Sequence, residues 1–125
     1  MNDKSNIENL LNKAFKFIAE DNHNEAEKII NFILENNTNL MLLDQATWQS
    51  IADIYLSIGR FEKAKEAYIH ANNTVGVVFA LIMLSDLDEA EFYLLKSSNS
   101  PAKAWCGFLI ELFRQKYIKN WPTFL

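Results

Sequence analysis

The stretch WQSIADIYLSIGRFEKAKEAY, residues 48–68, decides how this chain folds. Before Gly59 its apolar side chains recur at steps of three and four residues, a spacing that places them on one face of a helix. The same spacing resumes after Gly59, and glycine readily adopts the left-handed conformation that closes a helix. We therefore expect one helix capped by Asp44 and a second over 61–71, joined at Gly59 into an antiparallel hairpin.

Helical spacing of apolar residues continues on both sides of this hairpin. Ser100 followed by Pro101 marks another helix start, because serine caps a first turn and proline fits its first position. Asn72 and Asn73 predict a tight break between two helices. Five more helices are expected, over about 5–20, from the turn at 21–24 to Asn36, over 74–84, over 87–96 and from Pro101 to about Ile118. We also expect a loop over 37–44 and a last turn at Lys119–Pro122.

A small or apolar residue followed twelve positions later by an alanine recurs three times along the chain. An aromatic or aliphatic residue lies three positions after the first member of each pair. The three sets are Ala14, Phe17 and Ala26; Ala52, Tyr55 and Ala64; and Val78, Leu81 and Ala90. Alanines allow the two helices of a hairpin to cross closely, and the larger side chains fill the space between neighbouring hairpins.

The central hairpin resembles a tetratricopeptide repeat, clearest over 45–72, with weaker copies over 7–36 and 74–97. The matching residues are Trp48, Ile51, Ala52, Tyr55, Gly59, Phe61, Ala64, Tyr68 and Ala71. The resemblance implies an all-α fold, a right-handed α-solenoid of antiparallel helix hairpins, with 1–125 as a single domain or the N-terminal fragment of a longer array. Successive copies are 38 and 26 residues apart, from Ala14 to Ala52 to Val78, whereas regular arrays repeat at about 34. An irregular helical bundle with coincidental alanine spacing is the alternative.

The composition is that of one folded globular domain. Hydrophobic residues make up 50% of the 125 residues and charged residues 22%, which excludes the class of disordered chains. The net charge is −4 and no block of Lys or Arg occurs, so a basic partner is favoured over nucleic acid or an anionic membrane. A single cysteine, a polar N-terminus and the lack of an apolar run as long as a membrane span favour a cytoplasmic protein.

No group of residues in the sequence predicts an enzyme, a cofactor site or a metal site. His23 and His70 are isolated from other candidate ligands, so surface or capping roles are expected for both. Cys106 has no basic neighbour in the sequence and is expected to be buried and unreactive. The glycines are isolated from one another, which excludes a phosphate-binding glycine loop. The charged residues over 60–66 predict a solvated helix face with local ion pairs.

The resemblance further implies that the first helix of each hairpin lines a concave groove that takes a partner segment. The groove candidates are Leu11, Phe15, Ile18, Gln49, Asp53, Leu56, Val75, Phe79, Ile82, Leu109 and Phe113. Arrays that grip acidic C-terminal tails use basic or amide residues where Leu11 and Phe15 stand, so that mode of binding is not expected. Large exposed apolar patches usually mark binding surfaces. The alternative is that Phe15, Phe79 and Phe113 pack against one another inside a tight superhelix.

We therefore expect a non-catalytic protein–protein interaction module that binds a peptide or protein segment with apolar anchors through this groove. Asp53 would be available at the rim to a basic or amide group. A bacterial secretion-type tetratricopeptide chaperone is a narrower alternative. A self-associating structural domain of a larger protein is another, because Trp121–Leu125 is apolar and resembles the start of an eighth helix. In that alternative the apolar C-terminal end joins two copies into a homodimer.

Overall fold

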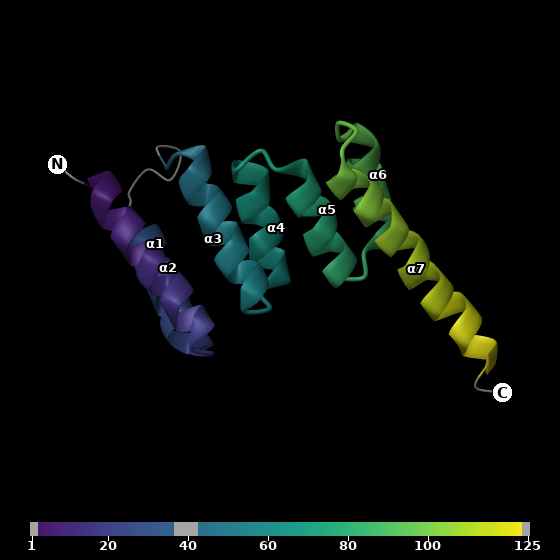
Figure 1. Ribbon diagram of the computed structural model, residues 1–125, viewed down its shortest axis with the longest axis horizontal. Helices are drawn as coiled ribbons and strands as arrows, with labels where there is room; N and C mark the ends of the chain where they lie inside the picture. The colour runs from purple at the N-terminus through teal and green to yellow at the C-terminus, as the bar shows by residue number, and fades with distance from the viewer. Residues whose placement is uncertain (1–2, 37–42, 124–125) are drawn as a thin grey trace.

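The computed structural model describes residues 3–36 and 43–123, with the side chains of 6–36 and 43–115. The described residues form no strand and seven helices: α1 (Asp3–Ala19), α2 (His23–Glu35), α3 (Gln45–Ser57), α4 (Phe61–His70), α5 (Thr74–Met83), α6 (Leu87–Lys96) and α7 (Pro101–Thr123). The helices stand in a row, with α1 and α2 at one end and α7 at the other (Figure 1). Consecutive helices pack against each other. The predicted all-α solenoid of helix hairpins is confirmed.

One turn geometry joins four pairs of consecutive helices. In each turn a residue with positive φ follows the helix, and the next residue donates its backbone N–H to the carbonyl five positions back. The positive-φ residues are Asp21, Gly59, Asn72 and Ser85, and the bonds run from Asn22 to Phe17, Arg60 to Tyr55, Asn73 to Tyr68 and Asp86 to Leu81. This Schellman motif satisfies carbonyls that a helix end leaves unpaired. The closing role predicted for Gly59 and the tight break at Asn72 and Asn73 are both confirmed.

The central turns recur at a fixed interval, because Gly59, Asn72 and Ser85 are 13 residues apart. Each of α4, α5 and α6 is 10 residues long. Two such steps take 26 residues, which is the separation of Ala52 and Val78 in the sequence. Short helices, rather than a lost turn, therefore explain why this part of the chain departs from the spacing of about 34 in regular tetratricopeptide arrays.

The core lies where the helices of each hairpin cross. All six small or apolar residues of the twelve-residue pattern are fully buried, at 0% exposure: Ala14, Ala26, Ala52, Ala64, Val78 and Ala90. Tyr55, Tyr68 and Leu81 are also buried in the same cluster. Small residues at crossing points let helix axes approach, and larger ones fill the space beside them. The packing role predicted from the spacing is confirmed.

The helix caps follow the sequence, whereas the C-terminal turn does not. The Asp44 carboxylate accepts the Thr47 N–H at 2.8 Å, and the Ser100 hydroxyl accepts the Lys103 N–H at 3.1 Å. The turn predicted at Lys119–Pro122 is wrong, as is a separate helix starting at Trp121, because α7 continues to Thr123. Pro122 lies in the last turn of α7, where its missing N–H removes a single helical bond. Of the predicted loop over 37–44, residues 37–42 lie outside the described residues.

Gly59→Ala tests the turn geometry. Gly59 has φ of 82°, and no atom lies within 4 Å of the position that an added Cβ would take, so backbone strain alone should lower the free energy of unfolding, by about 1 kcal/mol. Gly107→Ala is the matched control, because Gly107 lies inside α7 and its added Cβ would make an ordinary 3.6 Å contact with Leu94. The control should be neutral or stabilising by up to about 1 kcal/mol. Urea unfolding measures the stability of both variants, and equal stability of Gly59→Ala and the parent would contradict the role assigned to the left-handed turn.

Candidate functional site

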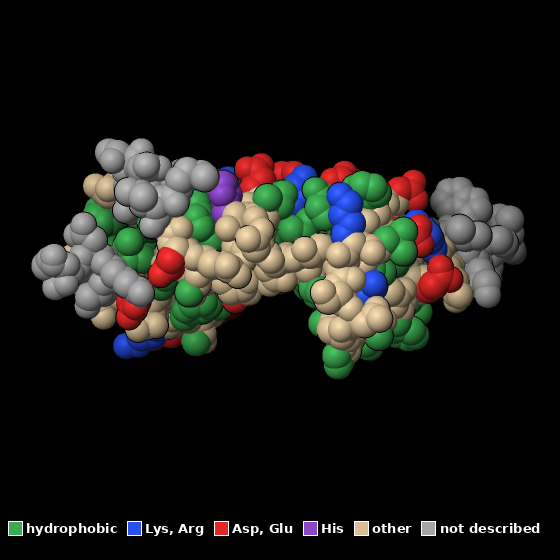
Figure 2. Space-filling view, turned by 90° about the horizontal axis from the view of Figure 1, so that it is seen from above, with side chains coloured by type: hydrophobic (Ala, Val, Ile, Leu, Met, Phe, Trp, Pro, Cys, Tyr) green, Lys and Arg blue, Asp and Glu red, His purple; other side chains and the backbone are tan. Residues whose placement is uncertain are grey.

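The odd-numbered helices form one side of the row. Helix α1 contacts α3, and α5 contacts α7. In Figure 1, α1 lies in front of α2 and α7 in front of α6. Seen from above, the outline of the molecule is indented on that side, over the central helices and between two end lobes (Figure 2). We call this side, which carries the predicted groove residues, the concave surface. Acidic and basic side chains gather along the opposite edge.

A polar network joins α3, α4 and α5 at the centre of the row. The Tyr68 hydroxyl of α4 donates to Asp53 Oδ1 of α3 at 2.5 Å, and Gln49 Nε2 donates to the same oxygen at 3.2 Å. Asn73 Nδ2 donates to Gln49 Oε1 at 2.9 Å, while Asn73 Oδ1 caps α5 by accepting the Gly76 N–H. We call Gln49, Asp53, Tyr68 and Asn73 the junction network. It ties α3 to α5 through α4.

Gly76 makes room for the ring of Tyr68. A Cβ at position 76 would lie 2.5 Å from Tyr68 Cδ1 and 2.6 Å from Cγ, well inside the closest approach of real side chains. The ring therefore rests on the backbone of α5, and its hydroxyl crosses to α3. Any larger residue at position 76 would displace the ring and break the bond to Asp53.

The Asp53 carboxylate is the only charged member of the junction network. It is half-buried, and the two side chains of the network that donate to it, Tyr68 and Gln49, are uncharged. Burial, and after it the hydrogen bond and charge of Asp53, raise the pKa of Tyr68 above its ordinary value. Tyr68 is therefore a neutral donor at physiological pH. The second carboxylate oxygen of Asp53 keeps capacity to accept from a further donor.

The predicted groove residues divide into three groups by their surroundings. Leu11 and Ile82 are buried and belong to the core. Five are half-buried and pack against the core: Ile18, Leu56, Val75, Leu109 and Phe113. The remaining four present surface on the concave side, with Phe15 at 37% exposure and Gln49, Asp53 and Phe79 half-buried. No ring contact joins Phe15, Phe79 and Phe113 within the described part of the chain, where the aromatic pairs are formed by other residues.

A shallow cleft of about 370 Å³ lies between α1 and α3 beside Phe15. Leu11 and Phe15 supply its apolar wall, and Asp44, Thr47 and Ser50 supply a polar wall at the start of α3. The sequence pattern singled out Leu11 and Phe15 but missed the polar wall. Asp44 and Thr47 carry the cap of α3, and that capping signal was the one sign of polar groups at this position.

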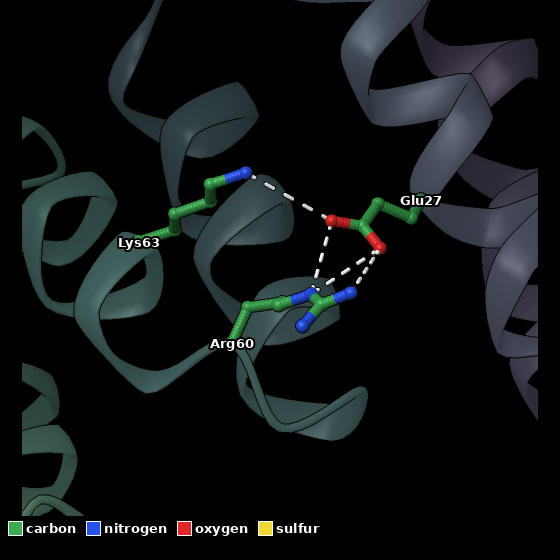
Figure 3. Close-up of polar contacts among 3 residues, drawn as sticks. All are labelled: Glu27, Arg60 and Lys63. Carbon is green, nitrogen blue, oxygen red and sulfur yellow. Dashed lines mark hydrogen bonds and ion pairs between the residues drawn. The ribbon is translucent and has the colours of Figure 1, made fainter.

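Arg60, the residue before α4, and Lys63 of α4 reach across to α2, which the sequence did not predict. Arg60 donates to both oxygens of Glu27, at 3.0 and 3.1 Å, and Lys63 Nζ lies 3.9 Å from the same carboxylate (Figure 3). The bond to Glu27 raises the pKa of Arg60. The expected local ion pair occurs only between Lys65 and Glu62, at 2.7 Å. The predicted solvated face with a local ion pair is confirmed, since Glu62, Lys63 and Glu66 are exposed and Lys65 pairs with Glu62. The sequence missed that Arg60 and Lys63 also fasten the first hairpin to the second through Glu27.

The histidines and the cysteine occupy structural positions. His70 stacks on the buried Trp48 ring with centroids 4.3 Å apart, and His23 lies 3.3 Å from Asp21 at a turn. Cys106 is buried as predicted, and burial raises the pKa of its thiol, which disfavours the reactive thiolate. Over residues 3–36 and 43–123, no cluster of three or more His, Cys, Asp or Glu is placed to hold a metal ion. No helix within those ranges is long and apolar enough to cross a membrane.

Alkaline unfolding tests the junction network. Because the pKa of Tyr68 is raised in the folded state, its stabilising effect is complete below the unfolded pKa of about 10 and is lost as the pH rises further. Tyr68→Phe should lower the free energy of unfolding by about 1 kcal/mol at pH 8, since Asp53 loses a donor. Above pH 10 the variant should lose less stability with rising pH than the parent does. Urea midpoints measured from pH 8 to alkaline pH check both. If the urea midpoints of the variant and the parent fall in parallel as the pH rises, the hydrogen bond from Tyr68 to Asp53 does not stabilise the fold as assigned.

No family model, no curated protein and no solved structure matches this chain.

Proposed function

We propose that this chain is a non-catalytic protein-interaction module of the tetratricopeptide type, which binds a peptide or protein segment on its concave surface. The observation that carries the proposal is the half-buried Asp53 carboxylate at the centre of that surface. Uncharged groups donate to it, and no cation pairs with it among the described residues. Such a carboxylate favours a cationic or amide group from a partner, since hydrogen bonds to charged groups are the stronger ones.

Aromatic side chains on two other helices supply the apolar part of the surface. Phe15 of α1 is 37% exposed, and Phe79 of α5 is half-buried without belonging to the side chains packed on the core. Phe79 lies one helical turn beyond Gly76, where Tyr68 packs. Large apolar side chains around a polar centre are typical of surfaces that hold a partner segment, because the apolar contacts supply affinity and the polar group fixes orientation.

The chemistry of the concave surface defines the partner class. A segment with an apolar anchor for Phe79 and a Lys, Arg or amide group for Asp53 fits both features. The net charge of −4 steers a basic segment toward the chain. Helix α3 carries Gln49 beside Asp53, so a backbone amide of the partner also finds acceptors and donors there.

Three features support the tetratricopeptide assignment. The alanine crossings are buried, the helices pair as antiparallel hairpins, and the hairpin turns share one geometry. The 26-residue step is shorter than the family spacing of about 34 and makes this a compact variant of that class. A secretion-type chaperone is a narrower form of the same proposal and acts on the same surface. The lone, buried Cys106 fits the reducing cytoplasm that we propose as its location.

Phe79→Asp tests the apolar anchor. A phage-displayed library of random peptides, selected on the parent chain, should enrich sequences that combine an aromatic or aliphatic anchor with Lys or Arg. Binding of an enriched peptide should weaken at least tenfold in Phe79→Asp, because a carboxylate replaces the apolar contact. Phe32→Asp is the matched control, since Phe32 is exposed on α2, away from the concave surface. Thermal melting of each variant separates lost binding from lost folding.

Asp53→Asn provides the second arm of this test without a change of shape. The amide oxygen still accepts from Tyr68, so the fold should hold, while the preference for Lys or Arg in the bound peptide should fall about tenfold. Peptides that bind both concave-surface variants as tightly as the parent would contradict the proposed site, and so would a library with no enrichment at all.

A further inference from the structure

A cleft of about 340 Å³ opens between α2 and α4, on the side of the row opposite the concave surface. Leu34 lies on the wall that α2 provides, and Ala67 lies on the facing wall of α4. Trp48 and Tyr55 of α3 line the space between these walls. We call this space the α2–α4 cleft. None of its lining residues belongs to the predicted groove or to the junction network.

The α2–α4 cleft follows its two helices for about two turns. At one end Glu27 of α2 faces Lys63 of α4, with the carboxylate and the ammonium group 3.9 Å apart (Figure 3). Leu34 lies seven residues beyond Glu27, and His70 lies seven residues beyond Lys63. Seven helical residues span about 10 Å. The cleft is therefore an elongated trough with a charged end and an aromatic end.

Aromatic side chains form the floor of the cleft. Trp48 and Tyr55 are 7% and 4% exposed, so both rings also belong to the core. His70 stacks on the Trp48 ring with centroids 4.3 Å apart, and Lys63 Nζ lies 5.6 Å from the centre of the Tyr55 ring. Clefts of about 300–1,000 Å³ that combine apolar and aromatic walls with a few polar groups are typical of small-molecule sites. The α2–α4 cleft has this size and composition.

The two floor residues each carry a polar atom without a hydrogen-bond partner. No described residue bonds to the Tyr55 hydroxyl or to the Trp48 indole N–H, although buried polar groups are normally hydrogen-bonded. In the described part of the chain, every side-chain nitrogen or oxygen sealed from solvent has a partner, so these two atoms reach the molecular surface. They do so in the cleft that both residues line.

Both of these polar groups are donors. Burial, and after it the charge of Glu27, raise the pKa of Tyr55 above its ordinary value, so its hydroxyl keeps the proton at physiological pH. The indole N–H of Trp48 can only donate. A ligand therefore satisfies the floor of the cleft with acceptor atoms. Lys63 and Glu66 place one charge of each sign along the cleft, so a net charge on the ligand brings no advantage.

The volume of the cleft sets the size of the ligand. A dry cavity of about 150 Å³ accommodates benzene, and the α2–α4 cleft has about twice that volume, so two fused rings fit. Seven residues separate Trp48 from Tyr55, which places their polar groups about two turns apart along the cleft. One acceptor atom cannot reach both donors. The ligand therefore needs an acceptor at each end of its ring system.

We propose that the α2–α4 cleft binds a small, uncharged, bicyclic aromatic molecule with an acceptor atom at each end. An acceptor oxygen takes the hydrogen bond of Tyr55 at the charged end, and the second acceptor takes that of Trp48 at the aromatic end. The rings lie between Leu34 and Ala67. A molecule bound there leaves Asp53 and Phe79 available to a partner segment on the concave surface. The two proposals therefore succeed or fail independently.

Quinoline-6-carboxamide is the probe for this site, because its ring nitrogen and its amide oxygen lie at opposite ends of two fused rings. Isothermal titration calorimetry with the full chain should give a Kd of about 1 mM or below. 2-Naphthamide lacks the ring nitrogen and should bind about threefold more weakly, since the Trp48 N–H then has no acceptor. Quinoline-6-carboxylate should bind no more tightly than the carboxamide. Equal affinity for the two amides, or tighter binding of the carboxylate, would contradict the proposed ligand class.

Two matched tyrosine variants separate binding in the cleft from stability of the fold. Tyr55→Phe should weaken binding of the carboxamide about fivefold. It should leave the free energy of unfolding unchanged, because the Tyr55 hydroxyl has no partner among the described residues. Tyr68→Phe should lower the free energy of unfolding and leave the Kd unchanged, since the Tyr68 hydroxyl donates to Asp53. Urea unfolding and calorimetry measure both quantities for each variant.

Indole signals in NMR spectra locate the bound probe. The indole N–H signal of Trp48 should shift when the carboxamide is added, whereas that of Trp105, which is exposed on α7, should stay in place. Trp105→Phe and Trp121→Phe assign the three indole signals of the chain. The proposal would be overturned by no heat of binding at millimolar probe, by equal binding to Tyr55→Phe and the parent, or by a shift confined to Trp105.

Discussion

The left-handed residue that follows α1, α3, α4 and α5 is the constraint on which the rest of the structure depends. Asp21, Gly59, Asn72 and Ser85 each reverse the chain within a few residues, so the following helix packs antiparallel against the preceding one. From Gly59 onward the turns recur every 13 residues, and equivalent positions of successive helices meet in one core. Ile51, Ala64, Val77 and Ala90 are buried members of one such series.

Tyr68 connects this constraint to the concave surface. Its backbone carbonyl closes the turn at Asn73, its ring rests on Gly76, and its hydroxyl donates to Asp53. A change in the turn after α4 would therefore move the ring and release the carboxylate. The same residue fixes the spacing of two helices and the orientation of the charged group between them, which is why the site lies at a helix junction rather than on one helix.

The sequence predicted the features that depend on interactions within a few residues, and it missed the features that depend on how the helices pack. Caps at Asp44 and Ser100, the turn at Gly59 and the helical spacing are local signals, and the structure confirms them.

Gln49 and Asp53 were predicted on the groove, yet Tyr68 was seen only as a packing residue, because its hydroxyl partner lies 15 positions away. The pair of Arg60 with Glu27 spans 33 positions and has no local signal. At the C-terminus Pro122 suggested a turn, yet α7 continues past it to Thr123.

In the proposed function the indented side of the row, formed around α3 and α5, holds a partner segment, whereas α2 and α6 lie on the other side of the row. Hydrogen exchange of backbone amides, measured with and without a peptide selected on the chain, distinguishes these regions directly. A bound peptide should slow the exchange of backbone amides in α3 and α5 and leave exchange in α2 and α6 unchanged. Protection confined to α2, α6 or the outer side of α7 would contradict it.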